Sequence, residues 1–405
     1  MSTAAETRPQ DPQTMPFRWV ILALMALTFI VTFFIRMTWP PLIPVVVPIL
    51  HMKMSQAGAY MSAFYIGYVI TQIPAGVLAD RLGVRTILTC SLLVLGLSTI
   101  GMGSIGTYDA GFYLRVITGL GAGSVFGAAI RALVEWFHPR ERGLAFGIMF
   151  ASPSAGIALS SIAVIPLNAH YGWQNAFRIC GLFAVVVGIL VLFLVKTSPS
   201  TQKSPSMFAG FPIVFGSRDL LLTSTAGFCL MWVELGTATW VVASIKKMGL
   251  SLAIAGVVMT AYGIGGILGP FLSGWMSDKI GRRKYIMIFF LIILIPLTIW
   301  FGMQTTVLTL TVWGFIFGFI SYCVNPHLTI LVSEAVDAKF AALANGTSNV
   351  IYQIAPIVVP IVTGWSVDVT GNFHAAWWIM ALGPLVGILV LLPVRAGTKP
   401  VAAKA

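Results

Sequence analysis

Long, nearly uncharged apolar runs repeat along the whole chain and limit what it can fold into. Of the 405 residues, 58% are hydrophobic and only 9% are charged, whereas soluble globular domains carry about 25% charged residues. A helix of roughly 20 apolar residues spans the hydrocarbon core and satisfies its own backbone hydrogen bonds there. The runs do not alternate with a period of two residues, so a β-barrel is disfavoured. The sequence therefore predicts an all-α membrane protein without a sizeable aqueous domain.

Charged residues, prolines and glycine clusters divide these runs into twelve expected transmembrane helices. The longest polar gap, residues 196–218, lies midway and is rich in Ser, Thr and Pro, which favours a flexible cytoplasmic linker. The expected order is a tail, six helices, the linker, six helices and a second tail, at residues 1–18, 19–195, 196–218, 219–394 and 395–405. The helices are expected near residues 19–47, 57–78, 86–105, 109–136, 143–166, 174–195, 219–244, 252–275, 285–303, 307–333, 341–364 and 374–394.

Positive charge follows the expected membrane topology. Most of the 24 Lys and Arg residues fall in segments that face the cytoplasm if the N-terminus is inside. The positive-inside rule then predicts an inner (plasma) membrane protein with both termini cytoplasmic. The net charge of +12 thus reflects contact with a lipid bilayer and not with nucleic acid.

Groups that would indicate an enzyme are not evident in the sequence. The four cysteines lie inside apolar runs and have no paired spacing for a metal or a disulfide. No nucleotide-binding loop, metal cluster or catalytic triad is recognisable. We therefore expect no cofactor, no metal and no enzymatic activity.

A short motif occurs twice, after the second expected helix of each half. Glycine permits a tight loop between helices, and an aspartate near a helix end can pair with an arginine across the bundle. This repeat relates the two halves, and we expect its Asp and Arg residues to act as gating charges on the cytoplasmic side. The copies are Gly76, Asp80, Gly83, Arg85 and, 198 residues later, Gly274, Asp278, Gly281, Arg283.

The repeated motif resembles the signature of the major facilitator superfamily, and the resemblance covers the whole chain. It implies two pseudo-symmetric six-helix bundles around a central cavity that opens alternately to either side. We expect the protein to act as a monomer. Further stretches are similar to the anion:cation symporters, a group that includes vesicular glutamate transporters, sialin and bacterial sugar-acid carriers. These are Phe34-Ile-Arg36, Gly67-Tyr68-Val-Ile-Thr-Gln72-Ile-Pro74-Ala-Gly76, Leu114-Arg115-Val-Ile-Thr-Gly119, Trp136-Phe-His-Pro-Arg-Glu141-Arg142 and Gly346-Thr-Ser-Asn349.

Three arginines lie inside expected helices, where a charge costs at least about 2.5 kcal/mol and needs a partner or a wet cavity. At 1.5 Å per residue, Arg36 and Arg115 reach similar depths in the outer half of the membrane. The resemblance implies that both face the substrate anion, and for Arg115 a structural tie between helices is the alternative. Arg131 lies near the cytoplasmic rim, one turn before Glu135, and we expect this pair to act as gating charges.

Glu234 is the most informative acid, because it stands 198 residues after Arg36 and so takes the equivalent place in the second half. Desolvation favours its protonated form and a facing arginine favours its ionised form, so its proton could move during transport. We expect Glu234 to couple transport to H⁺, and a fixed counter-ion for an arginine is the alternative. His327, beside Pro326, is a second candidate for proton coupling.

Weaker substrate-binding candidates are four polar residues in the expected cavity. Tyr68 and Gln72 lie one turn apart, and Tyr68 matches a substrate contact of the family. Ser348 and Asn349 belong to the motif of the helix expected at 341–364.

The chain departs from the family at its cation-coupling acids. Ile35 and Ala122 stand where relatives carry acids beside their two arginines, and Pro153 stands where sugar-acid carriers place a Gln. The family's coupling site therefore does not transfer, and a polyhydroxylated substrate is not expected.

Together, these features predict secondary transport of a small organic anion, a monocarboxylate or similar acid with a modest apolar body, by symport with H⁺. One alternative is an anion exchanger or efflux antiporter in which Arg36 and Glu234 only gate. Another is a sensor that binds without transporting; such a protein usually carries a signalling tail, and residues 396–405 are shorter than we would expect for one.

Overall fold

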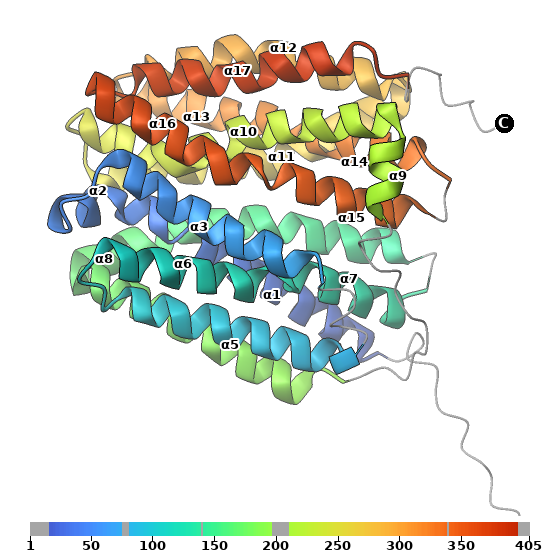
Figure 1. The fold of residues 1–405 in the computed structure, drawn as a ribbon, viewed down its shortest axis with the longest axis horizontal. Helices are drawn as coiled ribbons and strands as arrows, with labels where there is room; N and C mark the ends of the chain where they lie inside the picture. Colours follow the sequence, from blue (N-terminus) through green and yellow to red (C-terminus); the bar gives the residue numbers. More distant parts are fainter. Residues whose placement is uncertain (1–15, 75–80, 139–140, 197–209, 338–339, 396–405) are drawn as a thin grey trace, which may run out of the picture.

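The computed structural model describes residues 16–74, 81–138, 141–196, 210–337 and 340–395, and all regular structure in these residues is helical (Figure 1). The helices are α1 (Arg18–Arg36), α2 (Trp39–Ile49), α3 (Met54–Gln72), α5 (Val84–Met102), α6 (Tyr108–Gly123), α7 (Val125–Trp136), α8 (Arg142–Leu194), α9 (Gly210–Gly216), α10 (Arg218–Lys247), α11 (Leu252–Ile280), α12 (Arg283–Gly302), α13 (Val307–Tyr322), α14 (Asn325–Glu334), α15 (Ala341–Tyr352), α16 (Ala355–Thr370) and α17 (His374–Leu391). The expected all-α fold is confirmed for the described residues.

The number of membrane crossings also agrees with the sequence. Ten helical segments of the described residues are long and apolar enough to span a membrane. One of them contains α8, which is two crossings joined at Gly172, where φ is 78° and ψ is 162°. Helix α3 is a further helix of 19 residues, packed between α6 and α16. The described part of the chain thus supplies the twelve crossings of an integral multi-pass membrane protein.

The crossings form two bundles, one from α1 to α8 and the other from α10 to α17, which lie one above the other in Figure 1. The short helix α9 lies in the segment expected to be a flexible linker and packs against α15 and α10. The main contacts between the bundles are those of α3 with α16, α8 with α11, and α2 with α10.

The two bundles are joined at the end of the molecule where α2 meets α3, which we call the outer end in keeping with the orientation predicted from charge. Asp368 of α16 accepts hydrogen bonds from the backbone N–H groups of Met54 (2.7 Å) and Ser55 (2.9 Å) in the first turn of α3. Such N–H groups have no acceptor within their own helix and attract negative charge. Next to this contact the backbones nearly touch, because a Cβ at Gly58 would lie 2.1 Å from the carbonyl oxygen of Pro360.

The first crossing breaks directly after Arg36. Pro40 explains the break, because proline has no N–H to donate to the carbonyl four residues earlier and its ring clashes with that carbonyl. The freed oxygen of Arg36 accepts a hydrogen bond from Nη2 of Arg115 at 3.3 Å, and Nε of Arg115 donates to the carbonyl of Tyr60 at 3.4 Å. Arg115 of α6 therefore ties α3 to the end of α1, which is the structural role named above as its alternative.

We predict that Arg115→Ala destabilises the protein, because it leaves the buried carbonyl of Arg36 without a donor, at about 1–3 kcal/mol, and also removes the bond to the carbonyl of Tyr60. The melting temperature of the purified protein should fall by several degrees, and Arg115→Lys should recover part of the loss. Arg178→Ala, which removes an exposed arginine, serves as the control. A melting temperature of Arg115→Ala equal to that of the control would contradict the tie.

We also predict that Asp368→Ala loosens the outer junction. Backbone amides in the first turn of α3 should exchange with deuterium faster, since the carboxylate that accepts from Met54 and Ser55 is gone, while peptides at the other end of the bundles should not change. Asp109→Asn, which alters an exposed acid in the first turn of α6, is the matched control. Unchanged exchange at the start of α3 would show that Asp368 does not hold the bundles together.

Candidate functional site

Arg36 lies in a box of aromatic rings. Its side chain is 3% exposed, and its Cζ lies 4.1, 5.3, 5.1 and 4.8 Å from the ring centroids of Phe33, Phe64, Tyr65 and Tyr68. The negative faces of such rings attract a guanidinium. Its Nε and Nη2 nevertheless have no hydrogen-bond partner in the described part of the chain. A buried cation with unused donors is a site at which an anion can bind.

The box follows from the sequence of two helices. Phe64, Tyr65 and Tyr68 lie within slightly more than one turn of α3, so they present their rings on one side of it. Phe33 precedes Arg36 by three residues in the last turn of α1, where the helix dipole also favours a cation. The box therefore belongs wholly to the first bundle.

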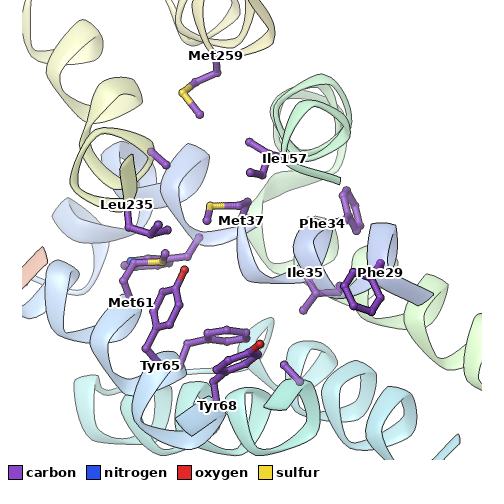
Figure 2. Packing of buried hydrophobic residues seen from close by; sticks show 14 of the residues in the cluster. Phe29, Phe34, Ile35, Met37, Met61, Tyr65, Tyr68, Ile157, Leu235 and Met259 are labelled. Carbon is purple, nitrogen blue, oxygen red and sulfur yellow. The ribbon is translucent and has the colours of Figure 1, made fainter. Parts of the chain in front are cut away.

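Soft apolar side chains from both bundles surround this region. Figure 2 shows Tyr65 pointing toward Met61 and Leu235, with Met37 beside them and Met259 farther away. Leu235 and Met259 come from α10 and α11 of the second bundle. Methionine adapts its shape easily, so these buried side chains can repack around one another.

Glu234 of α10 is 2% exposed, and its Oε1 accepts a hydrogen bond from Nδ2 of Asn325 at 2.9 Å. Asn325 begins α14 because Pro326 interrupts the crossing. Glu234 makes no ion pair with Arg36 among the described residues, so in this conformation its partner is an amide.

His327 does not join this group. It follows Asn325 by two residues, or about 200° around the helix, so it faces away from Glu234. The imidazole is fully buried, and neither of its nitrogens has a hydrogen-bond partner in the described residues. Those same described residues contain no group of three or more His, Cys, Asp or Glu that could hold a metal ion.

Amide side chains connect the bundles on the side of the Arg36 box away from the outer end. Nε2 of Gln72 donates to Oδ1 of Asn349 at 2.7 Å, and Nε2 of Gln353 reaches the same oxygen at 3.5 Å. The neighbouring Ser348 accepts a hydrogen bond from Ser224 of α10 at 2.8 Å, within its own bundle. The sequence analysis did not name Gln353 as a site residue. Its position, four residues after Asn349 and shortly before Pro356, could have identified it.

The predicted gating charges fall into two groups. Nε of Arg131 donates to Oε1 of Glu135 at 2.8 Å within α7, as their spacing predicted. Arg283, at the start of α12, forms an ion pair with Glu334 at the end of α14. Arg85 lies at the start of α5, and its Nε has no hydrogen-bond partner in the part of the chain described here.

The acids of the repeated loop motif cannot be compared with these pairs. Asp80 lies outside the described residues, and so does the side chain of Asp278. Their gating role stays a prediction.

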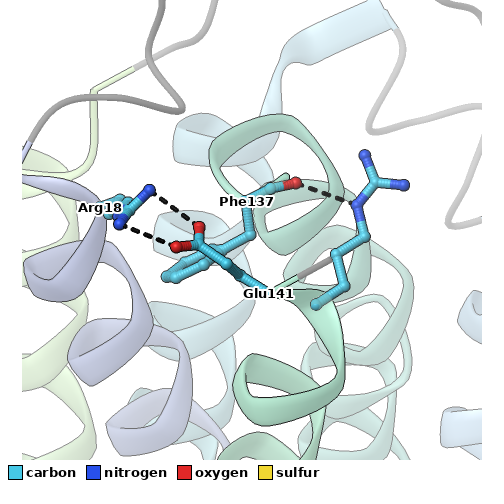
Figure 3. A network of polar contacts seen from close by, with 4 residues as sticks. Arg18, Phe137 and Glu141 are labelled. Atoms are coloured by element: carbon cyan, nitrogen blue, oxygen red, sulfur yellow. Dashed lines mark hydrogen bonds and ion pairs between the residues drawn. The ribbon is translucent and has the colours of Figure 1, made fainter. Parts of the chain in front are cut away.

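A polar network at the end of the first bundle opposite the outer end was not predicted. Arg18 donates to both carboxylate oxygens of Glu141, at 2.8 and 3.1 Å, and Nε of Arg142 donates to the carbonyl of Phe137 at 3.0 Å (Figure 3). The signal was the charged stretch that follows Trp136. This network joins α1 to the start of α8.

Comparison with known proteins is consistent with this architecture. The family model of the Major Facilitator Superfamily matches residues 24–257 and 236–405. The solved structure of the nucleoside transporter NupG superimposes with a TM-score of 0.77 at 14% identity and covers 93% of this chain and 100% of that one. An inward-facing, unoccupied bacterial homologue of the human lysosomal transporter Spinster gives a TM-score of 0.73 at 14% identity, covering 94% and 95%. These two likenesses show the fold.

Relatives of similar length carry transporter names. The "Probable sulfoacetate transporter SauU" of Cupriavidus necator is 25% identical over 93% of each chain. The "Probable galactarate/D-glucarate transporter GudP" of Bacillus subtilis is 26% identical over 83% of this chain and 82% of its own. The two-bundle fold and the family match together establish that the chain belongs to the Major Facilitator Superfamily and is a membrane transporter, not an enzyme.

Proposed function

We propose that this protein transports a small organic anion with a single carboxylate by symport with H⁺, and that Arg36 holds the carboxylate. The observation that carries the proposal is the buried guanidinium of Arg36, whose Nε and Nη2 are unused among four aromatic rings. Paired N–H donors of a guanidinium match the two oxygens of a carboxylate. The relatives named as a probable sulfoacetate transporter and a probable galactarate/D-glucarate transporter support an organic anion as the substrate.

Charge balance supports a proton as the partner of the anion. A change of buried charge between the two states that cross the membrane is costly, so both states should carry the same charge, to which Arg115 contributes equally in each. With substrate bound, the anion balances Arg36 and Glu234 carries a proton. Without substrate, an ionised Glu234 balances Arg36 instead. Each anion would then move with one proton.

Arg115 has a positioning role in this proposal. Its hydrogen bond to the carbonyl of Arg36 fixes the end of α1, and with it the direction of the Arg36 side chain. Arg115 is itself buried, and its Nη2 also lies 3.4 Å from the sulfur of Met61, so its donors are directed at the protein.

We predict that Arg36→Lys lowers uptake of carboxylates into proteoliposomes at least tenfold, because lysine keeps the charge but not the paired donors. The panel should include short aliphatic, aromatic and hydroxylated monocarboxylates, each offered under an inward proton gradient. Arg178→Lys, which changes an exposed arginine at the outer end, should transport like the wild type. Wild-type uptake and affinity in Arg36→Lys would remove Arg36 from the site.

We predict further that Glu234→Gln abolishes uptake driven by a proton gradient but preserves exchange of labelled for unlabelled substrate. Glutamine imitates the protonated acid, so the loaded carrier still crosses, while the empty carrier retains an unbalanced arginine and cannot return. Both assays use the same proteoliposomes, and Asp109→Asn is the control.

Two other results would contradict this role. Accumulation that still follows the pH gradient in Glu234→Gln would exclude Glu234 as the coupling group. Wild-type exchange that does not respond to pH, sodium or voltage would favour an obligate anion exchanger.

A further inference from the structure

The carboxyl group of Glu234 has one hydrogen-bond partner among the described side chains, the amide of Asn325. Glu234 is 2% exposed, and its Oε1 accepts from Nδ2 of Asn325 at 2.9 Å. A hydrogen bond is stronger when its acceptor is ionised, and more so where water is excluded. The N–H group of Asn325 therefore stabilises the carboxylate form of Glu234 more than the protonated form.

An amide can also bond a carboxyl group after the acid takes up a proton. Its Nδ2 donates to a carboxylate oxygen, and its Oδ1 accepts from the O–H of the protonated acid. A buried polar group that loses its only partner is unfavourable. Because Asn325 offers both atoms, the proton of Glu234 can leave and return without stranding a buried group.

The break in the fifth helix pair of the second bundle explains why Asn325 reaches Glu234. Pro326 cannot donate to the carbonyl of Tyr322, and α13 ends at that residue. Asn325 then begins α14, and the N-terminal end of a helix favours negative charge. The break thus brings both an amide and a helix end to the acid.

Other charged residues of the second bundle are distant from this contact. The helices that pack against α10 are α2, α9, α11, α14, α15, α16 and α17. Within the described ranges, the charged residues and the histidine at the ends of these helices and of α10 itself are Arg218, Asp219, Lys246, Lys247, Asp278, Lys279, Glu334, Asp368 and His374. Each lies ten or more residues from the middle of its crossing or at a helix terminus. The cation that balances Glu234 must therefore come from the first bundle.

The titratable groups at the depth of Glu234 are uncharged near pH 7. Tyrosines and cysteines carry no charge at this pH, and His327 faces away from the acid. Tyr65 of the first bundle points toward Leu235, the neighbour of Glu234, in Figure 2. The remaining groups of this kind are Cys229, Tyr262, Tyr322, Cys323 and Tyr352. Asn325 is thus the contact in the second bundle that responds to the proton of Glu234.

We infer that Asn325 is a positioning residue that acts through Glu234, holding the carboxylate in the empty carrier and the protonated acid in the loaded one. This rests on the proposed function, in which Glu234 carries the coupling proton. Asn325 does not touch the substrate in this assignment. Its loss should slow proton release and the return of the empty carrier, and it should leave the loaded carrier unaffected.

The experiment compares net uptake with exchange in proteoliposomes, using the carboxylate that the wild type transports best. Asn325→Leu, which has nearly the same shape and no amide, should lower net uptake about tenfold and keep exchange within about twofold of the wild type. One pH unit changes the ratio of ionised to protonated acid about tenfold. The internal pH that gives half-maximal uptake should therefore lie about one unit higher than in the wild type.

Two controls show that the effect passes through the acid. Asn325→Gln keeps the amide and should recover most of the net uptake. Asn345→Leu removes an amide of the same bundle that donates to Ser333, and it should leave the internal pH for half-maximal uptake unchanged. Added to Glu234→Gln, Asn325→Leu should not lower exchange further, because the two changes act on one interaction.

The outcomes separate this role from the proposed function. A wild-type internal pH for half-maximal uptake in Asn325→Leu would overturn the positioning role, and so would an equal loss of exchange and net uptake in the folded variant. Should Asn325→Leu fail to fold, Asn325→Ala removes the same donor from a smaller side chain and must show the same shift. Accumulation that still follows the pH gradient in Glu234→Gln would instead overturn the proposed coupling, whatever Asn325 does.

Discussion

The hydrogen bond from Arg115 to the carbonyl of Arg36 is the contact on which the site depends. This bond exists because Pro40 has no N–H to donate to that carbonyl within the helix. The first crossing therefore breaks directly after the charged residue Arg36. Arg115 thereby supplies the donor that the carbonyl at the break lacks, and Arg36 keeps free donors among aromatic rings. Two buried arginines at similar depth thus differ in their partners, since Arg115 bonds the backbone and Arg36 keeps unused donors, which in our proposal take the anion.

Prolines also interrupt crossings in the second bundle. Pro326 and Pro356 each interrupt a crossing, and the residues exposed at those interruptions, Asn325 and Gln353, are the ones whose amides face Glu234 and Asn349. A broken helix at membrane depth is tolerated where its backbone is covered by protein or lines a cavity. Polar groups of the site are therefore concentrated at proline breaks, while the surrounding methionines and leucines stay apolar.

Motion between the bundles is limited by contacts of α3. Its outer end is capped by Asp368, and its last turn is bound to Asn349 through Gln72. Both partners belong to one broken crossing of the second bundle, formed by α15 and α16. A rocking motion that opens the outer end would have to separate α3 from α16, which approach each other closely at Gly58 and Pro360.

The sequence by itself determined the crossings, the repeat and the buried charges, because hydrophobic length, loop charge and motif spacing are local properties. It also placed Arg36 and Glu234 at equivalent positions, yet it could not choose their partners. Only the tertiary structure decided that Glu234 meets Asn325, that His327 faces away, that Arg115 serves the backbone and that Gln353 joins Gln72 across the bundles. Such contacts depend on how helices far apart in sequence are rotated and where prolines break them, and no periodicity within one helix encodes which neighbour it will face.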